Sequence, residues 1–280
     1  MLLREVEYAR PASVEEALRL LASNDGARAL AGGQTLVNVM KARAAAPDLL
    51  VDLGALTDLT AVSTGAGGLE LGAMVTYAQL ASSSEVDVTR PILGEVAATI
   101  ADVQVRNRGT IGGNICSNDP TNHLPPLLVA LGATMKILGP RGERTVSADD
   151  FFLGVYLTAV GSGELLTKVT VPPPNGAGDG FAALTIGVDG TCIVNAAASV
   201  VGGAARIAIG CVSATPVRAT GMEEKLGGDF GEASVREAAK GLGAELDPPS
   251  DVHAGAEYRR HLAEVMAVRA VLQAAERARS

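Results

Sequence analysis

The chain is predicted to be an α+β protein whose C-terminal part forms a unit of its own. Up to residue 171, short apolar strands alternate with helical patterns, which is typical of α/β units. The run Pro172-Pro173-Pro174-Asn175-Gly176 is stiff and then flexible, as expected of a domain boundary. Beyond it, two apolar runs meet at Gly202-Gly203, which predicts an antiparallel strand pair, and helical patterns follow.

Capping signals and apolar periodicity place the individual elements. Ser13 with Glu16, and Thr76 with Gln79, have the spacing of capping boxes in front of helices, and Pro91 suits the first turn of another helix. A hairpin is predicted where Gly139-Pro140-Arg141-Gly142 separates two strands. Strands are expected at residues 27–31, 49–53, 69–73, 134–138, 144–147, 164–171, 192–201 and 206–212, and the last two helices at 232–242 and 254–279.

Composition limits the classes of function. Hydrophobic residues make up 48% of the chain and charged residues 19%, enough to bury a sizeable core. The net charge of −8 and the 3% of aromatic residues, with no Trp, argue against a nucleic-acid-binding surface. Neither the three cysteines nor the three histidines stand at metal-ligand spacing, so no metal site is expected in this chain.

The sequence also predicts where the protein resides. The N-terminus lacks the apolar core of a signal peptide, and Asn195, Arg206 and several glycines interrupt the most apolar run, at residues 193–212. An odd number of cysteines without a disulfide framework suits a reducing compartment. We therefore expect a cytoplasmic protein without a transmembrane segment.

The first candidate ligand-binding loop is Ala31-Gly32-Gly33-Gln34-Thr35-Leu36. It follows a predicted strand and precedes a predicted helix, so backbone N–H groups and the positive helix end can face an anion. The loop is not the G-x-G-x-x-G fingerprint, and a Rossmann fold is not inferred. A tight strand-to-helix turn without a ligand is the alternative that this loop leaves open.

The second candidate lies in residues 99–131, which the sequence predicts to be a helix end, a turn-rich loop and a short helix. The loop carries Thr110, Gly112, Gly113 and Asn114, and its glycine pair lets N–H groups converge on an anion. Arg106 and Arg108 bracket it with positive charge. Pro125 and Pro126 begin the helix that Gly132 can cap. A glycine-rich connection with no ligand is again the alternative.

No residues in the chain indicate catalysis by side chains. A Gly-x-Ser-x-Gly elbow is absent from the sequence, and so is an evident buried acid–base pair. Two anion-binding loops without a nucleophile, base or metal therefore suggest a bound cofactor that carries its own chemistry.

Three segments together resemble one protein family. They are the loop at residues 31–36, the strand Pro47-Asp48-Leu49-Leu50-Val51-Asp52-Leu53, and the segment at residues 104–114 (QVRNRGTIGGN). Their order and spacing resemble the FAD-binding medium subunits of the xanthine dehydrogenase family, above all that of carbon monoxide dehydrogenase and related molybdenum hydroxylases. The segment Thr215-Pro216-Val217-Arg218-Ala219 resembles the C-terminal domain of the same subunits.

The resemblance implies both a fold and a role. The fold is the two-subdomain FAD-binding type of the vanillyl-alcohol oxidases, over residues 1–56 and 57–175, with a C-terminal three-stranded sheet and helices over 177–280. FAD on this chain passes electrons from [2Fe–2S] clusters of a small subunit to an external acceptor. A large subunit with molybdopterin cytosine dinucleotide oxidises the substrate, and the assembly is a dimer of heterotrimers.

The resemblance also implies the residues that contact FAD, with none that is catalytic. Asp119 and Pro120 match the family's acidic pattern, but His123 stands where a second acid is common, and its neutral imidazole can still form hydrogen bonds. The implied contacts are Ala31, Gly32, Gly33, Gln34, Thr35, Leu36, Ala101, Thr110, Ile111, Gly112, Gly113, Asn114, Ser117, Asp119, His123, Leu165 and Leu166.

Two other functions compete with this one. A stand-alone FAD-dependent oxidoreductase of the same fold would need its own substrate pocket and usually a base. A flavin-free scaffold subunit would have no use for the glycine pair, which costs conformational entropy on folding. The organic or gaseous substrate and the electron acceptor are not encoded in recognisable residues of this chain.

Overall fold

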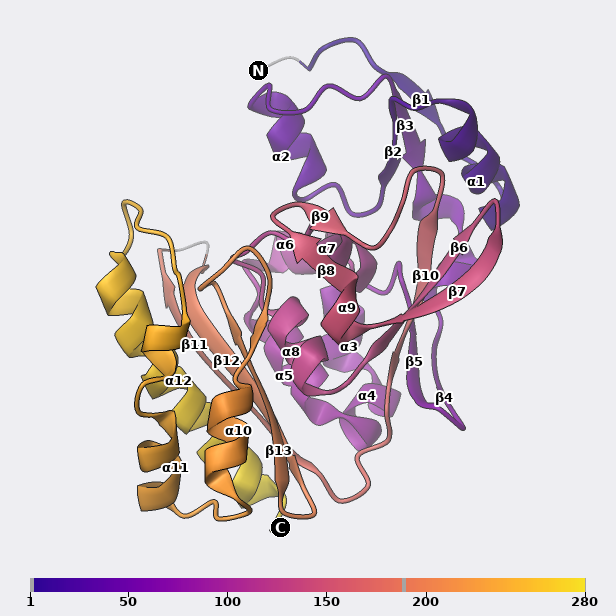
Figure 1. The fold of residues 1–280 in the computed structure, drawn as a ribbon. Coiled ribbons are helices and arrows are strands. Elements are labelled where there is room, and N and C mark those ends of the chain that lie inside the picture. The colour runs from indigo at the N-terminus through magenta and orange to yellow at the C-terminus, as the bar shows by residue number, and fades with distance from the viewer. Residues whose placement is uncertain (1–2, 188–189, 280) are drawn as a thin grey trace.

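The computed structural model describes residues 3–187 and 190–279, in which three larger sheets follow one another along the chain and residues 152–158 form a small two-stranded sheet (Figure 1). The N-terminal sheet has three parallel strands in the order β1-β3-β2, and the helix between β1 and β2 packs on it. Its elements are β1 (Glu7–Ala9), α1 (Val14–Ser23), β2 (Ala27–Leu30), α2 (Leu36–Lys41) and β3 (Leu49–Asp52), followed by 3-10 turns at Leu53–Ala55 and Thr57–Thr60.

The cap of α1 differs from the expected box in one hydrogen bond. The Ser13 hydroxyl accepts from the Glu16 N–H at 3.2 Å, as predicted. The Glu16 carboxylate instead accepts from the N–H of Ala12 at 2.8 Å, one residue before the N-cap. The box at Thr76 and Gln79 is complete, with both reciprocal hydrogen bonds present.

The middle unit is a five-stranded antiparallel sheet in the order β4-β5-β10-β6-β7. The predicted hairpin joins β6 to β7, with Gly139 paired to Gly142. A large apolar cluster fills the space between this sheet and its helices. The elements are β4 (Val62–Gly65), β5 (Gly68–Gly72), α3 (Tyr77–Ser82), α4 (Ser84–Thr89), α5 (Pro91–Thr99), α6 (Val103–Arg108), α7 (Ile111–Ser117), α8 (Leu124–Ala130), β6 (Thr134–Gly139), β7 (Gly142–Ser147), α9 (Ala148–Phe151), β8 (Phe152–Gly154), β9 (Leu157–Thr158) and β10 (Leu165–Val171).

The turn-rich loop predicted in residues 99–131 is wrong in part, because two short helices occupy it. Asp102 caps α6 by accepting from the Val105 N–H at 2.8 Å, and Thr110 caps α7 by accepting from the Gly113 N–H at 3.0 Å. Gly112 and Gly113 are therefore helical residues. Glycine disfavours helices in solution, but packing and caps override that preference here. The short helix α8 and its Gly132 cap, with φ +66°, are confirmed.

The C-terminal unit places its helices on one face of a sheet in the order β11-β12-β13-β14 (Figure 1). Three long strands agree with the expectation, and a two-residue strand, β14, adds an edge. Glycines let α12 lie directly on β11, since a Cβ at Gly178 would come within 2.0 Å of the Ala274 carbonyl oxygen. The elements are β11 (Gly178–Ile186), β12 (Thr191–Val201), β13 (Ala204–Gly210), β14 (Val217–Arg218), α10 (Thr220–Leu226), α11 (Glu232–Ala239), a 3-10 turn (Leu242–Glu245) and α12 (Ala256–Arg277).

A buried ion pair ties the middle and C-terminal units together. Arg90 lies 2.6 Å from the Asp179 carboxylate, and both side chains are almost fully buried. The Ser199 hydroxyl donates to the same carboxylate, and Arg90 also donates to the carbonyl oxygens of Pro172 and Pro173. The carbonyl oxygens of the proline run therefore take part in the contact between the two units. In the described ranges, no helix is long and apolar enough to cross a membrane.

Candidate functional site

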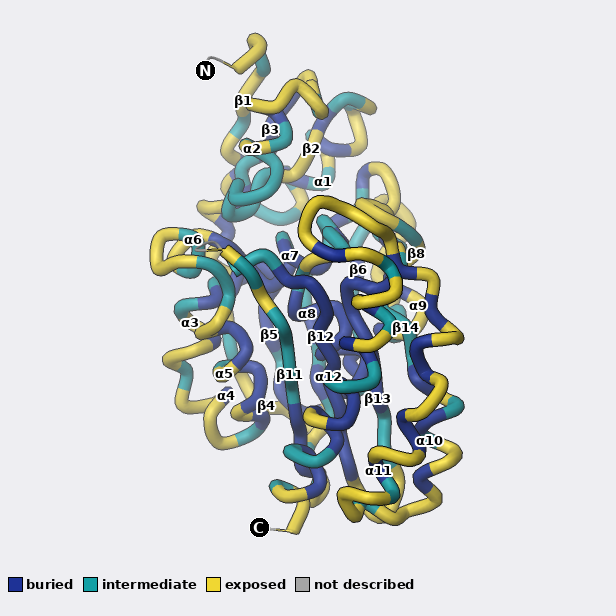
Figure 2. Tube along the Cα trace, turned by 90° about the vertical axis from the view of Figure 1, so that its left-hand side faces the viewer, coloured by how far each residue is buried: buried dark blue, intermediate teal, exposed yellow. Residues whose placement is uncertain are grey.

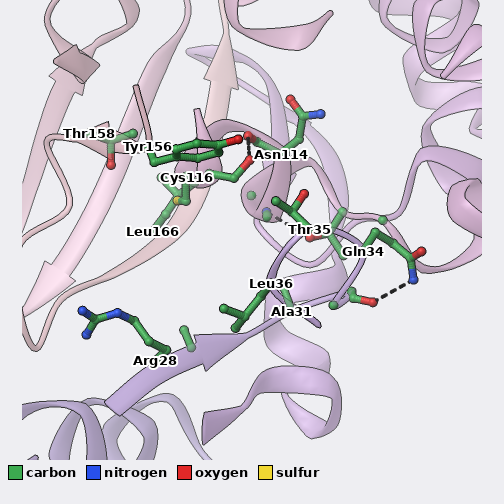
Figure 3. Close-up of a pocket in the computed structure, with 18 of the residues that line it drawn as sticks. Arg28, Ala31, Gln34, Thr35, Leu36, Asn114, Cys116, Tyr156, Thr158 and Leu166 are labelled. Atoms are coloured by element: carbon green, nitrogen blue, oxygen red, sulfur yellow. Dashed lines mark hydrogen bonds between the residues drawn. The ribbon is translucent and has the colours of Figure 1, made fainter. Parts of the chain in front are cut away.

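A cavity of about 1000 Å³ lies between the N-terminal unit and the middle unit. This volume is at the upper end for small-molecule and cofactor sites. Residues of β2 and the loop after it form one wall, and α7, the β8–β9 loop and β10 form the other. Figure 3 shows Arg28 and Leu36 on the first side, facing Cys116, Tyr156 and Leu166 on the second.

The loop at residues 32–36 presents unused hydrogen-bond donors to this cavity. In the described part of the chain, the backbone N–H groups of residues 32 to 36 have no hydrogen-bond partner. Gly33 adopts φ +74°, which favours glycine, and a Cβ at Gly32 would lie 1.9 Å from the Arg108 carbonyl oxygen. Thr35 begins α2 without a side-chain cap hydrogen bond, so its hydroxyl is also available.

The segment at residues 109–114 is different, because the N–H groups of residues 111–114 donate to oxygen atoms of the protein itself. The N–H of Ile111 donates to the Val75 carbonyl oxygen, and that of Gly112 to the Ala73 carbonyl oxygen, each at 2.9 Å. The N–H of Gly113 donates to the Thr110 hydroxyl, and that of Asn114 to the Thr110 carbonyl oxygen. The expectation that these N–H groups converge on an anion is wrong in this structure.

Packing accounts for the glycines of this second segment. A Cβ at Gly112 would meet the carbonyl oxygen and Cβ of Ala73 at 2.5 and 2.7 Å, and one at Gly109 would meet the Tyr77 ring at 2.5 Å. The segment still lines the cavity, and the buried Asn114 Oδ1 has no partner in the described residues. The amide nitrogen of Asn114 donates to the Tyr77 hydroxyl at 2.9 Å.

The structure brings together all but two of the residues implied to contact the cofactor. Ile111 is fully buried in the core of the middle unit, and Asp119 does not line the cavity. Leu165 and Leu166 line it and also belong to apolar clusters of the N-terminal and middle units. The residues that line the cavity are Ala31, Gly32, Gly33, Gln34, Thr35, Leu36, Ala101, Thr110, Gly112, Gly113, Asn114, Ser117, His123, Leu165 and Leu166.

The positive charge in the cavity comes from a residue that sequence analysis missed. Arg106 and Arg108 do not line it, and the Arg106 guanidinium donates instead to the carbonyl oxygens of Ile100 and Ala101. Arg28 is the only Lys or Arg among the described lining residues, where it accompanies the carboxylates of Asp25 and Glu164. The position of Arg28 on β2, directly before the glycine loop, is the sequence feature that could have identified it.

Four titratable side chains of the cavity are uncharged or paired at neutral pH. Burial lowers the pKa of His123 to about 4, and its ring stacks on Phe181 with centroids 5.6 Å apart. Burial raises the pKa of Tyr77 to about 12 and that of the Cys116 thiol to about 12. The hydrogen bond from Arg144 holds the pKa of Glu164 below its usual value. A poised general base is therefore missing from these four side chains.

Comparisons with known proteins agree with this architecture. Residues 4–174 match the model of the FAD binding domain in molybdopterin dehydrogenase, and residues 181–274 match that of the CO dehydrogenase flavoprotein C-terminal domain. The chain belongs to this family of FAD-binding medium subunits. Because the matches extend over nearly the whole chain, they also confirm the resemblance seen in the three sequence segments.

Relatives of this medium-subunit family align over almost their full length. The carbon monoxide dehydrogenase medium chain of Afipia carboxidovorans is 38% identical over 98% of this chain and 98% of its own. The nicotine 6-hydroxylase medium subunit of Paenarthrobacter nicotinovorans is 35% identical over 99% and 100%. A chain of quinoline 2-oxidoreductase from Pseudomonas putida 86 superposes with a TM-score of 0.94, at 36% identity over 100% of both chains.

Proposed function

We propose that this chain binds FAD in the cavity and serves as the electron-transfer subunit of a heterotrimeric molybdenum hydroxylase. The observation that carries the proposal is the row of N–H groups at residues 32–36, which have no partner in the described chain and line a cofactor-sized cavity. FAD when bound would supply the redox chemistry, accepting electrons and passing them on. The chain's own residues supply binding, orientation and exclusion of water.

The lining residues suggest how the cofactor is oriented. The N–H groups of residues 32–36 suit the pyrophosphate, because backbone donors favour a dianionic group, and the Arg28 guanidinium adds a positive charge to the same cavity. The apolar surface of Leu165 and Leu166 suits the flat ring system. Asn114 Oδ1 is left to accept from a donor of the ligand. FAD therefore fits the donor set of this cavity.

The same residues argue against the two competing functions. A stand-alone oxidoreductase usually needs a base close to its substrate. His123, with its low pKa, and the protonated Tyr77 and Cys116 supply none here. A flavin-free scaffold would have no use for a row of backbone donors that lines a cofactor-sized cavity. An electron-transfer subunit needs a tightly bound and oriented cofactor but no catalytic base.

The proposal extends to assembly and location. The partners are a large subunit with molybdopterin cytosine dinucleotide, which oxidises the substrate, and a small subunit with [2Fe–2S] clusters, in a dimer of heterotrimers. The cytoplasm is the proposed compartment. Residues 1–56 and 57–175 form the two FAD-binding subdomains, and residues 177–280 form the C-terminal domain. Carbon monoxide, an aldehyde or an N-heterocycle as substrate would bind the large subunit.

Flavin release tests the proposal directly. The chain is purified alone and together with co-expressed partner subunits, then denatured, and any released flavin is identified by absorbance and chromatography. We expect close to one equivalent of FAD in the supernatant of the complex. Flavin that stays attached to the precipitated chain would favour a covalent oxidase. A complex that assembles without any flavin would favour the scaffold.

A further inference from the structure

Tyr156 is an unusual residue at the edge of the cavity. It lies in the turn between β8 and β9 with φ +55°, a left-handed conformation that is rare for a bulky side chain. Its side chain lines the cavity although 58% of the residue is exposed. Strained backbone of this kind persists where the surroundings hold it, and it often marks a functional position.

The turn that carries Tyr156 is held by the residues that follow α7. The amide nitrogen of Asn118 donates to the Gly154 carbonyl oxygen at 2.7 Å, and the N–H of Tyr156 donates to the Asn118 carbonyl oxygen at 3.3 Å. The Tyr156 hydroxyl donates to Asp119 Oδ2 at 3.0 Å. The backbone and the ring tip of Tyr156 are thus both fixed by one short segment.

Asp119 is itself held in place. Its Oδ1 accepts from the N–H of Thr121 at 2.9 Å and from the Thr121 hydroxyl at 2.8 Å, which leaves Oδ2 directed at Tyr156. Burial and the neighbouring Asp119 carboxylate raise the pKa of Tyr156, so the hydroxyl keeps its proton and remains a donor. Asp119 therefore acts on the cavity through Tyr156 without lining it.

The ring of Tyr156 faces the apolar end of the cavity. In Figure 3 it lies on the same side as Cys116 and Leu166, across from the loop that carries Thr35. The anion-binding donors are at residues 32–36, so a cofactor whose phosphates lie there extends its ring system toward this end. Aromatic rings stack favourably on flat partners, and an exposed tyrosine ring beside an apolar wall offers such a surface.

We propose that Tyr156 covers one face of the bound flavin ring and that Asp119 is the positioning residue that holds it there. This inference rests on the proposed function and goes beyond it, because it assigns a cover that controls access of solvent and small oxidants to the ring. Phenol rings stacked on flavins quench flavin fluorescence by electron transfer, which gives the cover a spectroscopic signature.

The test uses the FAD-loaded protein, as the chain alone or in its complex, in wild type and in Tyr156→Leu, Asp119→Ala and Asp119→Asn. Two quantities are measured: the fluorescence of the bound flavin relative to free FAD, and its quenching by iodide. We expect Tyr156→Leu to raise both several-fold and Asp119→Ala to raise both in part. Asp119→Asn should stay close to wild type, because an amide oxygen still accepts from the hydroxyl. Tyr258→Leu, at an exposed residue on α12, should change neither.

The outcomes separate the two proposals. Bound FAD with unchanged fluorescence and iodide quenching in Tyr156→Leu would overturn the cover while leaving the FAD site intact. Wild-type chain and complex that both lack flavin would overturn the proposed function itself. If Tyr156→Leu does not retain FAD, the flavin fluorescence of Asp119→Ala is compared with that of Asp119→Asn. Both variants keep the Tyr156 ring, so the comparison tests the positioning role of Asp119. Equal flavin fluorescence in those two variants would refute the positioning role.

Discussion

The two glycine segments that face the cavity look alike in sequence and differ in structure. At residues 32–36 the backbone donors are left without partners in the described chain, whereas at 111–114 each N–H donates to a protein oxygen. Gly33 needs its positive φ, but Gly112 needs only the absence of a Cβ against Ala73. A glycine pair can therefore serve a ligand or serve packing, and only the hydrogen bonds tell which.

The two segments therefore have different roles, one in ligand binding and one in stabilising the fold. The first segment is suited to holding an anion, and it lies on a small parallel sheet at one end of the molecule. The second segment is a capped helix packed on the core of the middle unit, as the buried trace through α7 and α8 shows (Figure 2). Changes in the second should damage the fold, and changes in the first should damage cofactor binding.

The largest effect is expected at Gly112. Replacing it with alanine sets a Cβ 2.5 Å from the Ala73 carbonyl oxygen, and this backbone cannot move without disturbing β5 and α7. We expect Gly112→Ala to lower the free energy of unfolding by about 3 kcal/mol, the upper end for overpacking. Urea denaturation followed by circular dichroism measures it. Gly255→Ser, where nothing lies within 4 Å of the added Cβ, is the control. An unchanged free energy of unfolding in Gly112→Ala would contradict the packing role.

The pH dependence of stability tests whether the His123 side chain, which lines the cavity, is shielded from solvent. Burial lowers the pKa of His123 from 6.5 to about 4, so between these values the unfolded chain binds a proton that the folded chain does not. The free energy of unfolding should therefore rise with pH across this window, by roughly 3 kcal/mol in total, and level off above it. Urea denaturation of the apo chain from pH 4 to 7 measures the slope. His123→Gln should flatten it, and the exposed His261→Gln should not. Equal slopes in both variants would show that His123 is well solvated.

The sequence predicted the elements around both segments better than their roles. The strand before Gly32, the helix after Thr35, the capping box at Thr76 and the hairpin at Gly139 are local signals, and the structure bears them out. The helices α6 and α7 were missed because glycines and asparagines argue locally against a helix. Their stability depends on the caps at Asp102 and Thr110 and on the packing of α6 against α3 and of α7 against β10.

The site residues that lie next to one another in the sequence could be predicted, whereas those held by distant residues could not. Residues 31–36 could be found from one loop, but Tyr156 reaches the cavity only because Asn118 and Asp119 hold a turn nearly forty residues away. Arg106 and Arg108 looked like the site's charge, but the guanidinium of Arg106 turns to carbonyl oxygens of the preceding residues. Which of several arginines enters a cavity depends on tertiary packing, which a single sequence does not display.

Arg28 offers a sharper test of the first segment. As the only described cationic residue of the cavity, it should bind phosphate and leave the flavin ring unaffected. We expect Arg28→Gln to raise the Kd for FAD by about tenfold, as the loss of one charge-assisted hydrogen bond would, and to leave the Kd for riboflavin unchanged. Added salt should reduce the difference for FAD. Fluorescence titration measures both ligands, with Arg19→Gln on α1 as a control of equal charge. Equal weakening of FAD and riboflavin would rule out a phosphate contact.

The smallest effects come from two threonines that begin helices in the two segments, and they give the most direct comparison. The Thr110 hydroxyl caps α7, so Thr110→Val should cost about 1 kcal/mol of stability. The Thr35 hydroxyl caps nothing, so Thr35→Val should leave stability within about 0.5 kcal/mol and weaken FAD by roughly three- to tenfold, the value of one hydrogen bond. Urea denaturation of the apo chains and FAD titration separate the two quantities. If Thr35→Val instead destabilised the fold and spared FAD, the first segment would be a structural turn like the second, and the unpaired donors beside it would need another ligand.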